Sequence, residues 1–170
     1  HTLGLNHDSA PVEVREKLAF SPSSVPIALS SFAQSFPSSE IVILSTCNRV
    51  EIYATSQDDS LNKNTLLDFF SAFHGLPKEE FADHMYHHQG INAVRHLFFV
   101  ASSLNSGVLG ETQIISQVKE AYQTATTAET TGSIINQLFQ RSLTVAKDVH
   151  TKTAIGKGNI SVSTVAVDLA

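Results

Sequence analysis

The feature that most restricts the fold is a short aliphatic run that ends abruptly in polar residues. Residues 41–44 read IVIL, a mostly β-branched stretch typical of a strand covered on both faces. The polar residues 45–49 follow at once, and residues 50–55 then alternate between apolar and polar side chains. Such alternation predicts a partner strand with one buried face, and Glu51 lies on the other face. We therefore expect Cys47 to lie at a turn between two paired strands.

The segments around this strand pair predict how the sheet is completed. An apolar stretch at 3–7 predicts a first strand, and the proline-interrupted helical pattern at 12–36 follows it. A helix is expected over about 61–74 with Gly75 as its stop, and residues 81–88 are expected to form a fourth strand. The order strand, helix, strand, strand, helix, strand predicts an α+β fold with a ferredoxin-like split βαβ sheet.

The remainder of the pattern is helical. Apolar residues recur at three- and four-residue spacing over 91–104, 114–125 and 134–146, as expected of helices with one buried stripe. We therefore predict a ferredoxin-like core at about 1–89, followed by a helical part at about 90–155.

The last residues suggest the beginning of another unit. Gly156 and Gly158 break the helical pattern, and a new apolar pattern runs to Ala170 without completing an element. We interpret 1–155 as one domain and 156–170 as the truncated start of a linker or second domain. The sequence contains no complete Gly-rich nucleotide motif, so no cofactor site is predicted within this chain.

Composition limits the classes of function. A chain of 170 residues that is 42% hydrophobic can bury one ordinary core. No apolar run is long enough to span a bilayer and no secretory signal begins the sequence, so we expect a soluble, cytoplasmic protein. The formal charge of −5 argues against a general nucleic-acid coat. The last thirty residues are the most basic, which leaves room for a small RNA footprint, with cations at Arg141, Lys147, Lys152 and Lys157.

Cys47 is the candidate nucleophile. A single cysteine has no internal disulfide partner, so it either fills space in the core or performs chemistry. A nucleophilic cysteine acts as its thiolate, which nearby cations and N–H donors stabilise. Arg49 lies two residues on, where an extended turn would place its charge near the sulfur. The alternative, a small buried hydrophobic cysteine, stays open at this point.

Other polar residues give weaker signals. His96 lies off the apolar stripe of its helix, where it is a general base or simply a surface or capped histidine. Glu111 and Gln113 lie at the start of a predicted helix. They either recognise an ammonium or amide group, or they only stabilise the helix start, where Glu favours the positive end of the helix dipole. His84 and His88 face one side of the expected strand and His87 the other, without completing a tetrahedron, so no metal site is predicted.

Several motifs resemble those of the glutamyl-tRNA reductases. Residues 45–53 read STCNRVEIY and are similar to the signature around that family's cysteine nucleophile. Residues 4–12 resemble the family's opening, and the segments at 96–114 and 117–119 resemble its second motif. The match continues through 162–170, so the resemblance covers essentially the whole chain.

The resemblance implies a two-step reduction at the start of the five-carbon route to tetrapyrroles. The Cys47 thiolate would attack the ester of glutamyl-tRNA and leave a glutamyl thioester, which is then reduced to glutamate 1-semialdehyde at the expense of NADPH. The NADPH site and a dimerisation domain are expected beyond this chain, so the chain alone is expected to form the thioester, with at most esterase activity. The implied partners are glutamyl-tRNA, a second copy, and the next pathway enzyme, glutamate-1-semialdehyde aminomutase.

The resemblance also implies roles for individual residues. Cys47 matches the family's nucleophile, and His96 matches its activity-critical histidine. Residues that match the pocket for the glutamyl group and the acceptor end are Thr46, Asn48, Arg49, Ser106, Glu111, Thr112, Gln113 and Gln117. Ser103, Asn105 and Gly107 depart from the family pattern, in which glycine, aspartate and a bulky apolar residue are expected.

Two other functions fit the residues without the resemblance. Cys47 and His96 would serve an unrelated thiol acyltransferase or hydrolase that needs no tRNA. Alternatively, a ferredoxin-like module would bind RNA or a regulator with Cys47 as a structural residue, although aromatic and basic residues are not interleaved on the predicted strands.

Overall fold

A four-stranded antiparallel sheet forms the centre of the molecule. The computed structural model describes residues 1–58, 60–105, 113–153 and 155. The strands lie in the order β2-β3-β1-β4, each antiparallel to its neighbour. Their bounds are β1 (Thr2–Asn6), β2 (Ser39–Ser45), β3 (Arg49–Ser56) and β4 (Tyr86–His88). This order, with helices after β1 and β3, is the split βαβ arrangement, so the predicted α+β fold is confirmed.

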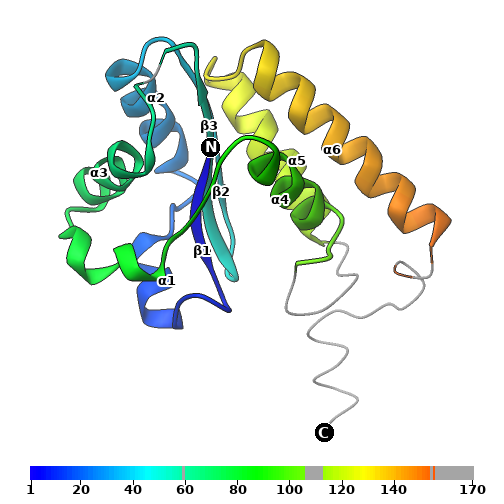
Figure 1. Cartoon of the computed structure of the whole chain (residues 1–170), viewed down its shortest axis with the longest axis horizontal. Coiled ribbons are helices and arrows are strands. Elements are labelled where there is room, and N and C mark those ends of the chain that lie inside the picture. The colour runs from blue at the N-terminus through cyan, green and yellow to red at the C-terminus, as the bar shows by residue number, and fades with distance from the viewer. Residues whose placement is uncertain (59, 106–112, 154, 156–170) are drawn as a thin grey trace, which may run out of the picture.

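One face of the sheet is covered by the helices that connect its strands. These are α1 (Val12–Leu18), α2 (Val25–Ser35) and α3 (Lys63–His74), which lie together on one side in Figure 1. Phe32 of α2 contacts Phe69 of α3 edge to face, with ring centroids 5.1 Å apart. This side is a conventional apolar core.

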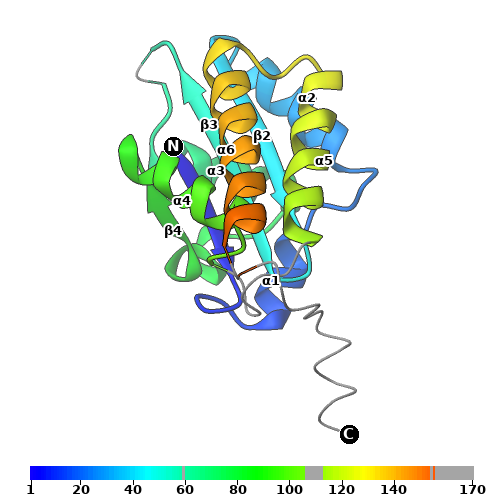
Figure 2. The same ribbon diagram turned by 90° about the vertical axis from the view of Figure 1, so that its right-hand side faces the viewer.

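The other face is covered by three later helices. They are α4 (Ile91–Ala101), α5 (Gln113–Thr127) and α6 (Ser133–Lys152), opposite α1–α3 in Figures 1 and 2. Tyr53 of β3 packs edge to face on Phe139 of α6, with centroids 5.5 Å apart. Both faces of β3 are therefore buried, and the prediction of one exposed face was wrong.

None of the helices in the described part of the chain has the length and apolarity needed to cross a membrane.

The fourth strand is shorter than predicted. Of the residues 81–88 that were expected to be extended, Ala82–His84 form a short 3-10 turn, η2, and β4 begins only at Tyr86. Another 3-10 turn, η1 (Lys78–Glu80), precedes them. Phe81 is 1% exposed, so it anchors these turns in the core rather than alternating along a strand. His84 lies in η2, and its Nδ1 lies 3.0 Å from the Ser9 carbonyl oxygen.

Candidate functional site

Cys47 lies exposed at the turn between β2 and β3, as the sequence predicts. The Thr46 hydroxyl shapes this turn from inside, accepting the N–H groups of Asn48 (3.2 Å) and Arg49 (3.1 Å). The Thr46 N–H closes the turn on the Arg49 carbonyl at 2.8 Å. The alternative of a buried, space-filling cysteine is therefore wrong.

Two neighbouring segments tie the Cys47 turn to the sheet end. The His7 N–H donates to the Asn48 carbonyl at 2.9 Å. Arg15 of α1 donates from Nε to the Cys47 carbonyl at 3.4 Å and from Nη1 to the Ala10 carbonyl at 2.7 Å. The backbone that carries the thiol is thus held from both sides.

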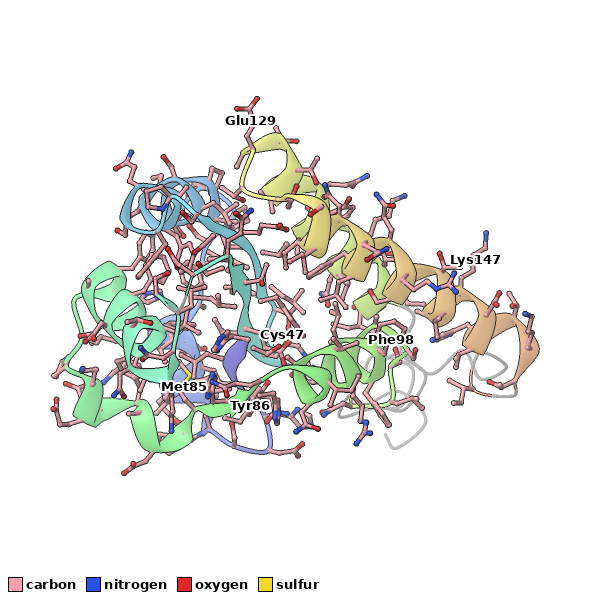
Figure 3. The ribbon with its side chains drawn as sticks, turned by 45° about the horizontal axis from the view of Figure 1, so that its top comes forward. Cys47, Met85, Tyr86, Phe98, Glu129 and Lys147 are labelled. Carbon is pink, nitrogen blue, oxygen red and sulfur yellow. The ribbon has the colours of Figure 1, made fainter. Side chains whose placement is uncertain are left out.

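A small hollow beside Cys47 brings together all five of the predicted pocket residues that the structure describes. Its wall combines the turn with the first helical turns of α5, and Ile114 supplies an apolar side chain. The lining residues are Thr46, Cys47, Asn48, Arg49, Gln113, Ile114 and Gln117. Figure 3 places Cys47 between the two helical layers, with Lys147 far out on α6. Because Cys47 is exposed beside this hollow, an acyl group can reach its thiol.

Arg49 is buried and firmly paired. Its side chain is 2% exposed, Nη1 donates to Glu51 Oε1 at 2.7 Å, and Nη2 donates to the Asn105 carbonyl. Burial alone would lower the pKa of Arg49, but the Glu51 carboxylate and two nearby tyrosines raise it. The charge that was expected beside the sulfur is therefore largely neutralised by Glu51.

Glu51 is the centre of a buried polar cluster, defined here as Arg49, Glu51, Tyr53, Tyr86 and His96. Its carboxylate is 0% exposed and accepts from both tyrosine hydroxyls as well as from Arg49. His96 Nε2 lies 2.8 Å from Glu51 Oε1. Burial would raise the pKa of Glu51, but hydrogen bonding from His96 and the charge of Arg49 lower it to about 2. The carboxylate is therefore ionised, and His96 Nε2 must be the donor.

The tyrosines of the cluster are permanent donors. Burial and the adjacent Glu51 charge raise the pKa values of Tyr53 and Tyr86 well above the ordinary value. A buried carboxylate is stable only when it is paired and hydrogen-bonded, and these four partners meet that need.

Gly4 makes room for the cluster. It pairs with Glu51 across β1 and β3, and a Cβ added at Gly4 would lie 2.7 Å from Glu51 Cγ and 2.6 Å from the Val50 carbonyl. Any larger residue at this position would push Glu51 away from its partners.

His96 is buried in the cluster, so the alternative of a surface histidine is wrong. It is 9% exposed and does not line the Cys47 hollow, but Glu51 and Arg49 connect it to that hollow. Glu51 was missed in the sequence analysis because this residue was placed on an exposed face of its strand. The amphipathic helices predicted after residue 90 could have corrected this, because their apolar stripes need a second sheet face to pack against.

The segment after α4 contains the departures from the family pattern. Ser103 has φ +59°, a left-handed conformation that favours glycine and costs other residues roughly 1–2 kcal/mol. Asn105 offers its carbonyl to Arg49, and its Oδ1 lies 3.5 Å from Asn6 Nδ2. Gly107 and three predicted pocket residues lie outside the described residues: Ser106, Glu111 and Thr112.

The chain is similar in sequence to glutamyl-tRNA reductases. Residues 3–153 match the family model for the N-terminal domain of glutamyl-tRNAGlu reductase. The chain is 46% identical over 168 residues to a glutamyl-tRNA reductase of Pseudoalteromonas translucida and 47% identical over 169 residues to one of Pelotomaculum thermopropionicum. Each match covers 99% of this chain but only 40% and 38% of the relative.

A solved structure extends the likeness to three dimensions. The glutamyl-tRNA reductase of Methanopyrus kandleri superposes with a TM-score of 0.80 at 34% identity, covering 99% of this chain and 38% of that one. The chain thus spans about two fifths of the relatives that it matches. From the family model, the sequence identities and the shared fold together, the chain belongs to the glutamyl-tRNAGlu reductase N-terminal domain family.

Proposed function

We propose that this chain accepts the glutamyl group of glutamyl-tRNA on Cys47, as the first half of a glutamyl-tRNA reductase reaction. The observation that carries the proposal is the exposed thiol in a hollow lined by Thr46, Asn48 and Gln117. A thiolate attacks the ester carbonyl carbon, a carbon–sulfur bond forms, and the bond to the ribose oxygen breaks. The ribose oxygen takes up a proton and leaves with the tRNA, and a glutamyl thioester remains.

The residues of the site have distinct parts in this proposal. Thr46 fixes the turn, while Asn48, Gln113 and Gln117 contact the glutamyl group or the acceptor end. Arg49, which the family resemblance places in the same pocket, lines the hollow with its guanidinium held by Glu51 and the Asn105 carbonyl. Ser106, Glu111 and Thr112 keep the same role as predictions from the family resemblance. His96 acts as a positioning residue, because its bond to Glu51 holds the carboxylate that in turn holds Arg49.

The second half of the reaction needs a hydride donor that these residues do not fit. Over the described residues every strand is antiparallel to its neighbours, so the sheet has no pair of adjacent parallel strands with the Gly-rich turn that cradles a dinucleotide. We therefore assign NADPH binding, and formation of glutamate 1-semialdehyde for tetrapyrrole synthesis, to a part of the protein outside this chain. A homodimer and a contact with glutamate-1-semialdehyde aminomutase remain predictions from the family resemblance.

Intact-mass spectrometry tests the proposal directly. The chain is incubated briefly with glutamyl-tRNA, quenched in acid, and compared with Cys47→Ser. A glutamyl adduct on the wild type alone is the expected result. If neither protein carries an adduct, and tRNA deacylation is no faster with the wild type than with Cys47→Ser, Cys47 is not the acyl acceptor.

A further inference from the structure

Among the described residues, the cations of the Cys47 turn and of α1 differ in whether a carboxylate pairs with them. Arg49 is buried against Glu51, and Lys17 of α1 pairs with Glu80 at 3.0 Å. Arg15 differs from both. Its Nε lies 3.4 Å from the Cys47 carbonyl oxygen, so its guanidinium adjoins the residue that bears the thiol.

Arg15 keeps its charge and spare hydrogen-bonding capacity. Its hydrogen-bond partners are the backbone carbonyls of Ala10 and Cys47, neither of which carries a charge. Within the described part of the chain, no carboxylate pairs with Arg15 and Nη2 has no acceptor. The side chain is partly exposed, so an anionic group can reach it.

We propose that Arg15 binds the phosphodiester on the 5′ side of the esterified terminal nucleotide. This inference rests on the proposed function, since an ester bound at Cys47 places the terminal ribose beside Arg15. Only one sugar ring separates the esterified hydroxyl from the 5′-phosphate. A guanidinium anchored by two carbonyls is pre-organised for phosphate oxygens, and phosphate contacts fix the position of a nucleic acid. Arg15 thus distinguishes a nucleotide ester from a small ester.

A matched pair of small substrates tests this role. The two esters are 3′-O-glutamyl-adenosine and 3′-O-glutamyl-adenosine 5′-monophosphate, which differ only in the phosphate. The rate of adduct formation on Cys47 is measured for the wild type, Arg15→Gln and Arg15→Lys. We expect the wild type to favour the phosphorylated ester about tenfold, as one charge-assisted contact allows, and Arg15→Gln to lose that preference. Arg15→Lys should retain part of it.

Controls separate the phosphate contact from other effects. Lys17→Gln changes a neighbouring exposed cation of α1 and should leave the preference intact. Thermal unfolding and adduct formation with the unphosphorylated ester show whether each variant keeps its fold and its Cys47 turn.

The other outcomes are equally informative. If Arg15→Gln slows both esters equally, Arg15 only holds the Cys47 turn, and the phosphate role is wrong. A wild type that forms adducts without preferring the phosphate overturns this inference and leaves the proposed function standing. A wild type that forms no adduct with any glutamyl ester overturns both.

Discussion

The two faces of β3 differ in chemistry although their residues alternate along one strand. Val50 and Ile52 face α1–α3 and are enclosed by apolar side chains. Glu51 and Tyr53 point the other way, toward His96 of α4 and Phe139 of α6, and are equally buried. We call the face with Val50 and Ile52 the apolar face, and the face with Glu51 and Tyr53 the polar face. Each buried side chain of the apolar face adds a small amount to the stability of the fold, whereas the polar face depends on every member of one hydrogen-bonded cluster. Only the polar face leads through Arg49 to the Cys47 hollow.

The largest expected effect comes from removing the charge at the centre of the polar face. Glu51→Gln leaves Arg49 buried without a counter-charge, so we expect a loss of about 3–5 kcal/mol in the free energy of unfolding. Denaturant unfolding measures the loss. Glu79→Gln, at an exposed carboxylate, is the control and should lie within about 0.5 kcal/mol of the wild type. A small loss for Glu51→Gln would mean that Arg49 and the rest of the cluster do not depend on the Glu51 charge.

Acid should weaken the polar face specifically. The pKa of Glu51 is lowered from 4.5 to about 2 in the folded protein. Its contribution is therefore fully present above about pH 5 and is lost as the pH falls toward 2, amounting to about 3 kcal/mol. The free energy of unfolding is measured across this pH range for the wild type and for Glu51→Gln, and the difference between the two is followed with pH. A difference that stays constant with pH would contradict the cluster's charge state.

Crowding the polar face from the opposite strand should have an intermediate effect. Gly4→Ala places a methyl group 2.7 Å from Glu51 Cγ and 2.6 Å from the Val50 carbonyl oxygen, a backbone atom that cannot move aside as a flexible side chain would. We expect a loss of about 1–3 kcal/mol, as for other overpacked sites. Thermal unfolding measures it, and the tyrosine absorption spectrum reports whether the cluster has shifted. An unchanged stability would show that β1 moves freely against β3.

The apolar face should respond more mildly. Ile52→Val removes one methylene from a fully buried side chain and should cost about 0.5–1.5 kcal/mol. The loss should be the same at pH 3 and pH 7, because Ile52 is fully buried within the apolar core. A strong pH dependence would mean that the two faces are coupled through the strand.

The smallest effect on stability is expected at the residue that matters most for the proposed chemistry. Cys47 is exposed, so Cys47→Ser should change the free energy of unfolding by less than about 0.5 kcal/mol while abolishing the glutamyl adduct. Equilibrium unfolding and intact mass are measured on the same sample. A large loss of stability would instead indicate that the thiol packs in the core.

Local pattern accounted for the parts of the site that local hydrogen bonds build. The aliphatic run, the polar stop and the alternation after it sufficed to place Cys47 at a turn, because strand geometry and turn residues act over a few positions. The same reasoning overextended the fourth strand, since a single aromatic anchor at Phe81 can be buried without extended backbone.

The amino-acid pattern was enough to predict the order of the strands and helices, the α+β class and the residue that is proposed to carry the acyl group. The burial of Glu51, the neutralisation of Arg49 and the place of His96 in the cluster became evident only from the way the helices pack on the sheet. Periodicity along β3 reports which side chains share a face, but not what covers that face. The cover comes from α4, whose His96 is 45 residues away from Glu51 in the chain.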